Sequence, residues 1–194
     1  MAIPAILFNI TEPLIGLADI AIIGLMDKDV TYAQGGVGLA AGLIATIIWG
    51  LAQMRTSLSA IISRHVGKGD LNPVLSLIPQ CFSLTVIIGI LFGFLTAYYY
   101  DGIAHFIFGS ITELTFQFSN DYFVIRSIGL PISLLIALFF GVFRGFQNTS
   151  WAMVIGIVGG VLNIVLDYCL ILGIEGIVEP MGVKGAAWAS VVAQ

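Results

Sequence analysis

Charged side chains are scarce in this sequence. Asp, Glu, Lys and Arg together account for 9% of the 194 residues, whereas a soluble domain has roughly 25%. A soluble protein cannot cover its surface with so few charges, so the composition excludes an ordinary soluble domain. The net charge of −4 is spread along the chain and forms no basic patch, so we expect no nucleic-acid partner.

The residues that usually carry catalysis or bind metals are also few. Cys81 and Cys169 both lie in apolar runs, which is typical of small buried hydrophobic residues and not of a disulfide framework or a metal site. His65 and His105 stand alone. The order Ser–His–Asp, the spacing of zinc ligands and the nucleotide-binding fingerprints are all missing. We therefore expect neither an enzyme nor an organic cofactor.

Apolar residues make up most of the sequence. They account for 59% of the chain, and the mean hydropathy is +1.07. Because a helix needs about 20 mostly apolar residues to cross a bilayer, we predict an all-α polytopic membrane protein in one lobe, with five complete transmembrane helices and the start of a sixth. The predicted helices are residues 2–26, 36–66, 74–100, 117–143, 151–172 and 183–194.

The last apolar segment is short. It stops at Gln194 after about ten residues, too few to cross the hydrocarbon core. We therefore expect the chain to be the front piece of a longer protein that has a further, carboxy-terminal lobe. The second predicted helix ends near Arg64, and the loops after the second and fourth predicted helices carry Lys68 and Arg144. By the positive-inside rule these loops are cytoplasmic, which places the amino terminus inside the cell.

Two carboxylates interrupt the apolar runs. Asp19 lies in the first predicted helix and Asp167 in the fifth, although a charge at the bilayer centre costs about 2.5–3.5 kcal/mol on insertion scales. Both lie roughly 8–10 Å from the outer ends of their helices at 1.5 Å rise per residue. Asn163, four residues before Asp167, shares its helix face. We predict that these groups meet in a common interior and bind a cation or a proton.

A structural role is the alternative for buried acids. Intramembrane carboxylates can pair with arginine, and Arg55 and Arg126 lie in the second and fourth predicted helices. Glu12, nearer the inner half of the first helix, is well placed to form a buried structural pair with Arg55. The matched depth of Asp19 and Asp167 is not needed for such pairing and favours a functional role.

Four segments resemble one transporter family. In order along the chain, they are similar to the first helix, to the second helix and its loop, to the fourth helix and its cytoplasmic turn, and to the fifth helix with the opening of the sixth, of the multidrug and toxic compound extrusion (MATE) family. The details are closest to its DinF-like prokaryotic branch. The segments are residues 2–24, 53–70, 125–149 and 153–194, the last of which contains NIVLDYCLILG and GVKGAAWASVVAQ.

The resemblance implies a twelve-helix antiporter of the prokaryotic inner (plasma) membrane. It would exchange Na⁺ or H⁺ for small organic, often cationic, compounds, and this chain would form most of its amino-terminal lobe. The family's cation site matches Asp19, Asn163 and Asp167, whose oxygens would hold Na⁺ in a sodium-coupled protein, and a helix-six Thr of relatives matches Ser190. The family's helix-bending proline matches Pro4.

We therefore expect alternating access driven by cation exchange. Asp19 and Asp167 repel one another when both are ionised, and a bound cation removes that repulsion, so that the first helix can bend near Pro4 and Pro13. Two other functions stay open. A flippase for a lipid-linked precursor would need several Lys or Arg side chains in its cavity. A non-transport assembly subunit would use the small residues Gly156, Gly159 and Gly160 as a packing face.

Overall fold

Long apolar helices form nearly all of the described chain. The computed structural model describes residues 15–194, so Pro4, Glu12 and Pro13, with the predicted helix bend and the Glu12–Arg55 pair, lie outside the described residues. Residues 15–23 are helical. The helices that follow are α2 (Val30–Leu51), α3 (Met54–Lys68), α4 (Asn72–Tyr98), α5 (Tyr100–Phe108), α6 (Glu113–Ile128), α7 (Leu130–Gly145), α8 (Thr149–Ile171) and α9 (Val183–Val192).

Three stretches of this part of the chain are long and apolar enough to cross a membrane. They are Val30–Lys68, which joins α2 and α3, together with α4 and α8. The pair α6 and α7 would make a fourth crossing, bent by 55°. Large apolar side chains such as Leu75, Phe94 and Val158 are more than 60% exposed, which suits contact with lipid and would be unfavourable in water. Within the described residues the fold is all-α, as predicted, and its β pairing is an isolated bridge between Ile174 and Val178.

Two helix starts differ from the sequence prediction. Helix α2 begins at Val30, whereas its polar and glycine-containing first turns were expected to be loop up to Gly36. Ala33 and Val37 are buried on the inner face of these turns, so packing outweighs the weak local helix preference. Helix α6 begins at Glu113, before the predicted start at residue 117, and α5 occupies much of the stretch between the third and fourth predicted helices.

The bend between α6 and α7 has a local cause. Pro131 is the second residue of α7, and a proline has no backbone N–H to continue the hydrogen-bonding of the preceding helix. Gly129 separates the two helices, and a side chain there would press against Val191 of α9. The bend therefore directs α6 toward α9 while α7 continues along α3 and α4.

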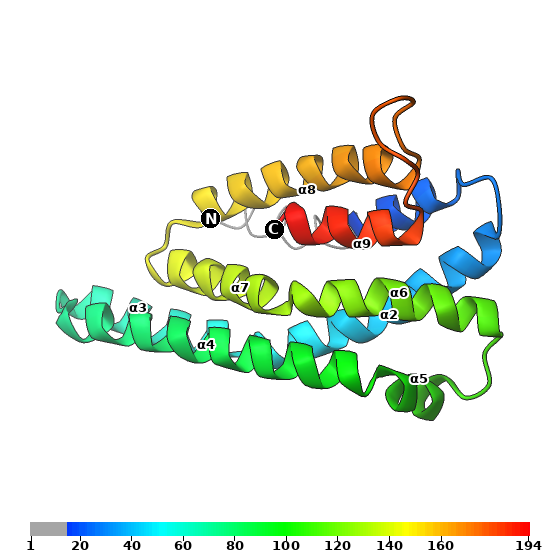
Figure 1. Cartoon of the computed structure of the whole chain (residues 1–194). Coiled ribbons are helices and arrows are strands. Elements are labelled where there is room, and N and C mark those ends of the chain that lie inside the picture. Colours follow the sequence, from blue (N-terminus) through cyan, green and yellow to red (C-terminus); the bar gives the residue numbers. More distant parts are fainter. Residues whose placement is uncertain (1–14) are drawn as a thin grey trace.

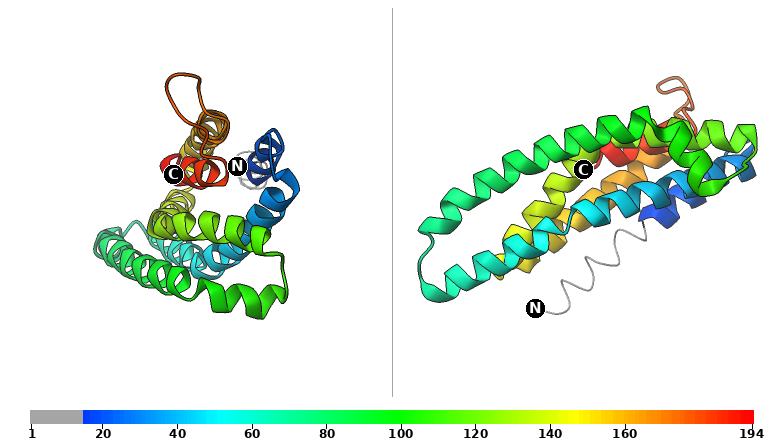
Figure 2. Two further views of the ribbon diagram at one scale, coloured as in Figure 1. Left: turned by 45° about the vertical axis from the view of Figure 1, so that its right-hand side comes forward. Right: turned by 90° about the horizontal axis from the view of Figure 1, so that it is seen from below.

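The helices form three levels (Figures 1 and 2). The α6–α7 pair lies in the middle. Helices α3, α4 and α5 lie on one side of it, and α8 and α9 lie on the other side, next to the helical residues 15–23. Helix α2 packs against α6, and α9 packs against both α6 and α8. The first described helix is thereby placed beside α8 and α9, although their residues are far apart in sequence.

Close backbone contacts hold these helices together. In lipid, burying apolar surface gives little driving force, so helices associate through tight packing at small residues. A Cβ at Gly141 in α7 would lie 2.6 Å from the backbone oxygen of Arg55 in α3, and a Cβ at Gly185 in α9 would lie 2.5 Å from the backbone oxygen of Leu170 in α8. Only glycine allows the two helix backbones to approach this closely.

Replacing Gly141 with alanine tests this packing. Because the new methyl group would meet the backbone of Arg55, Gly141→Ala should lower the free energy of unfolding by about 1–3 kcal/mol. The matched control is Gly38→Ala in α2, where nothing lies within 4 Å of the new Cβ and where alanine should stabilise the helix by about 0.5–1 kcal/mol. Thermal unfolding of the purified protein in detergent measures both. Equal midpoints for the two variants would contradict the packing account.

Candidate functional site

Four predicted site residues meet in one buried cluster. Asp19 comes from the first described helix, Asn163 and Asp167 from α8, and Ser190 from α9. Their exposed fractions are 4%, 2%, 0% and 8%, respectively. The structure therefore brings together the two acids and the amide that the sequence placed at one depth, along with the serine that the resemblance added.

The sequence of α8 explains why its polar groups face inward. Its buried residues in the carboxy-terminal half are Gly160, Asn163, Asp167 and Ile171, at spacings of three and four residues that place them on one side of a helix. The remaining surface of this part of α8 is apolar and exposed, with Val161 and Val165 more than half exposed. Asn163 and Asp167 thus lie on the one stripe that lipid does not reach.

Hydrogen bonds connect three of these side chains. The Ser190 hydroxyl donates to Oδ2 of Asp19 at 3.4 Å. In the amide orientation that satisfies both polar atoms of Asn163, its nitrogen donates to Oδ1 of Asp19 at 3.2 Å and its oxygen accepts from the backbone N–H of Ser190 at 3.2 Å. Asn163 thereby bridges Asp19 to the backbone of α9.

Asp167 is the less satisfied of the two acids. Its carboxyl group lies near the Asp19 carboxyl group. Its Oδ1 atom is buried, and none of the described residues donates a hydrogen bond to it. Two neighbouring carboxylates in a low-dielectric interior repel one another strongly when both are ionised. Either a bound cation compensates their charge, or one of them takes up a proton.

The oxygen donors of the cluster suit a hard cation. Two carboxylates, an amide and a hydroxyl offer the kind of ligands that cations such as Na⁺ accept, whereas soft metals prefer thiolate or imidazole. Among residues 15–194 there is no group of three His, Cys, Asp or Glu side chains that could hold a metal ion. The oxygen atoms present could hold a hard cation such as Na⁺, and either carboxylate could instead take up a proton.

Helix α6 contributes two residues that sequence reasoning did not assign to the site. Tyr122 is 3% exposed, and its hydroxyl lies near Asp19 and Ser190. Arg126 interacts electrostatically with Asp19 and with Asp167. The available signal was their spacing of four residues, which places a tyrosine and an intramembrane arginine on one helix face.

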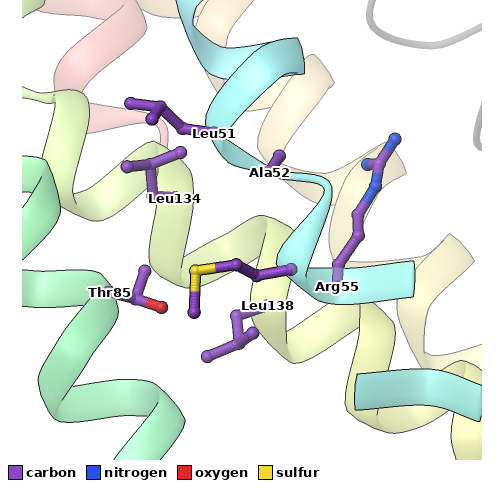
Figure 3. Close-up of a pocket in the computed structure, with 7 residues that line it drawn as sticks. Leu51, Ala52, Arg55, Thr85, Leu134 and Leu138 are labelled. Atoms are coloured by element: carbon purple, nitrogen blue, oxygen red, sulfur yellow. The ribbon is translucent and has the colours of Figure 1, made fainter. Parts of the chain in front are cut away.

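Arg55 lies elsewhere. It is the second residue of α3 and lines a small cavity between α2, α4 and α7 (Figure 3). Its guanidinium group points away from the Thr85 hydroxyl, which is buried and has no hydrogen-bond partner within the described part of the chain. Of the two arginines that could have neutralised the acids, the structure places Arg126, and not Arg55, beside them.

Curated relatives match the chain over its whole length. The chain is 31% identical to DNA damage-inducible protein F of Escherichia coli (strain K12) over 194 residues, all of this chain and 40% of that protein. It is 27% identical to the probable multidrug resistance protein NorM of Thermotoga maritima, again over all of this chain and 40% of the relative. The chain therefore spans about 40% of the length of these relatives.

Solved structures show the same fold. A transporter of the MOP superfamily from Pyrococcus furiosus superposes with a TM-score of 0.85 at 24% identity, over all of this chain and 40% of that one. A multidrug resistance MATE family transporter in an outward-facing conformation gives a TM-score of 0.84 at 24% identity, over all of this chain and 41% of that one.

Residues 4–169 match the MatE family model. The chain belongs to the MatE family, and its all-helical fold is that of MATE transporters.

Proposed function

We propose that this chain is the amino-terminal lobe of a cation-coupled antiporter. The complete transporter would lie in the inner (plasma) membrane of a prokaryote, with its amino terminus in the cytoplasm, and would export small organic cations in exchange for Na⁺ or H⁺. The observation that carries the proposal is the buried pair of acids, Asp19 and Asp167, with an oxygen of Asp167 left without a partner among the described residues.

Charge repulsion supplies the coupling in this proposal. When both acids are ionised, each destabilises the other, because the protein interior screens charges far less than water. A bound Na⁺ or a proton removes the repulsion and allows the helices that carry Asp19 and Asp167 to approach. Since those helices are different elements of the lobe, occupancy of the site changes the helix arrangement, which is what alternating access requires.

The Asn163 amide responds to occupancy in the same scheme. With the amide nitrogen toward Asp19, Asn163 donates a hydrogen bond to a negatively charged oxygen. With the amide turned over, its oxygen faces Asp19, an arrangement that is unfavourable unless a cation lies between the two oxygens. A rotation of Asn163 therefore accompanies cation binding, at no cost in helix packing.

The charges around the acids bear on the two alternatives. A flippase for anionic lipid precursors would gather several basic side chains in its cavity, but within the described residues Arg126 is the single basic group that interacts with Asp19 and Asp167. A purely structural assembly subunit would have no need for two adjacent buried acids, which destabilise one another. Both alternatives are therefore less well supported than cation exchange.

Removing either acid should abolish coupled transport. In the complete transporter reconstituted in vesicles, Asp19→Asn and Asp167→Asn should each lower Na⁺- or H⁺-driven export of an organic cation such as ethidium by about 100-fold or more, because the loss of one ionic ligand removes at least 2.7 kcal/mol of coupling. Asp101→Asn is the matched control, since the Asp101 side chain is 76% exposed in α5, which lies on the other side of the α6–α7 pair from α8 and α9 (Figure 1). Separate Na⁺ and pH gradients identify the driving ion. Full transport by both site variants would refute the proposal.

Replacing the neutral side chains Ser190 and Asn163 should impair cation-driven transport less than replacing Asp19 or Asp167. Ser190→Ala removes the long 3.4 Å hydrogen bond to Asp19 and leaves the backbone N–H that Asn163 uses, so the apparent affinity for the driving cation should fall only about threefold to tenfold. Asn163→Ala loses the bridge and the amide oxygen, so its effect should be larger. Ser83→Ala, at an exposed serine of α4, is the control. A larger loss in Ser190→Ala than in Asn163→Ala would contradict these roles.

A further inference from the structure

Arg126 acts on Asp19 and Asp167 electrostatically but forms an ion pair with neither acid. It follows Tyr122 by one helical turn on α6, and Tyr122 interacts with Asp19 and Ser190, so this face of α6 is turned toward the site. Its Nη1 atom is buried and has no hydrogen-bond partner among the described residues. Within residues 15–194 the ion pairs are His105–Asp101 and Lys184–Asp121, so neither acid forms a direct ion pair with Arg126.

Few other charges face the site from the elements packed around it. On α9, Lys184 pairs with Asp121 of α6 at 3.5 Å, both partly exposed, so this pair adds no net charge. Tyr122 is neutral, and Gln34 of α2 donates to the backbone oxygen of Ile20. Glu12 lies outside the described residues and is included in the test below. Within the described part of the chain, the charged groups that act on the site are therefore Asp19, Asp167 and Arg126.

The net charge of these groups determines how many cations the site can bind. Asp19, Asp167 and Arg126 together carry one net negative charge when both acids are ionised. A low-dielectric interior strongly favours a neutral cluster. One monovalent cation or one proton therefore neutralises the cluster, and a second would leave it positive. Without Arg126, the same two acids would need two monovalent cations.

The separation between Arg126 and the acids is as important as its charge. A guanidinium group in direct contact would occupy both carboxylates and exclude a cation. Since Oδ1 of Asp167 has no hydrogen-bond partner within the described residues, the place for an exchangeable cation is left open. Arg126 thus contributes a fixed positive charge while the ligands themselves stay available.

We propose that Arg126 is the residue that sets the coupling number of the transporter, acting as a fixed counter-charge that limits the Asp19–Asp167 site to one monovalent cation or proton per cycle. This inference rests on the proposed function of the site. It adds the number of cations bound per transport cycle and names the residue that determines that number.

The test counts the cations bound by the purified, complete transporter. Binding of radioactive Na⁺ and uptake of protons, measured with a pH electrode, are added together, and the count for the double variant with Asp19→Asn and Asp167→Asn is subtracted as background. The wild type should take up one cation, and Arg126→Lys, which keeps the charge, should also take up one. Arg126→Gln should take up two, and Arg126→Gln combined with Asp167→Asn should return to one.

The outcomes separate this inference from the proposed function. A background-corrected count of zero in the wild type would refute the cation site itself. A wild-type count of two, or an unchanged count of one in Arg126→Gln, would overturn the role of Arg126 and leave the cation site standing. Where Arg126→Gln alone does not fold, Asp167→Asn is compared with the variant that combines Arg126→Gln and Asp167→Asn. Counts of zero and one, respectively, support the role of Arg126, and equal counts would overturn it. Glu12→Gln should leave the number of bound cations unchanged. A changed number would show that the charge of Arg126 compensates Glu12 and not the two aspartates.

Discussion

The repulsion between two buried carboxylates is the constraint around which this lobe is built. Asp19 and Asp167 are 4% and 0% exposed, and each lies in the neighbourhood of the other. Neither lipid nor apolar packing can stabilise such a pair. The surrounding groups stabilise the negative charge of the pair. Asn163 and Ser190 donate hydrogen bonds to Asp19, and Arg126 supplies a positive charge without forming an ion pair.

Helix packing holds this unfavourable cluster together. Glycines at the crossings of α3 with α7 and of α8 with α9 let backbones approach to a separation that no side chain would allow. Helix α9 lies against both α6 and α8, so Ser190 and Tyr122 reach Asp19 from different directions. The helix packing thereby brings ligands from separate helices together, and in the proposed cycle cation binding changes how closely those helices approach.

Much of this arrangement could be predicted from the sequence, because an intramembrane charge is rare and its depth can be counted along a helix. The all-α class and the meeting of Asp19, Asn163 and Asp167 follow from apolar run lengths and from the spacing of four residues in α8. The start of α2 at Val30 could not be predicted, because tertiary burial of Ala33 and Val37 decided it. The choice of Arg126 over Arg55 also required the structure, since both arginines lie in apolar helices and only the fold shows which one faces the acids. The roles of Pro4, Glu12 and Pro13 stay predictions, as these residues lie outside the described part.

Infrared difference spectroscopy of the complete transporter tests the central claim most directly, because it reports the state of the carboxyl groups themselves. On acidification in Na⁺-free buffer, or on addition of Na⁺ at alkaline pH, the account predicts a change in the carboxyl or carboxylate stretching bands that disappears when Asp19 and Asp167 are both replaced by asparagine. A spectrum that responds to neither cation, or a response that persists in the double variant, would show that these two acids do not share an exchangeable cation.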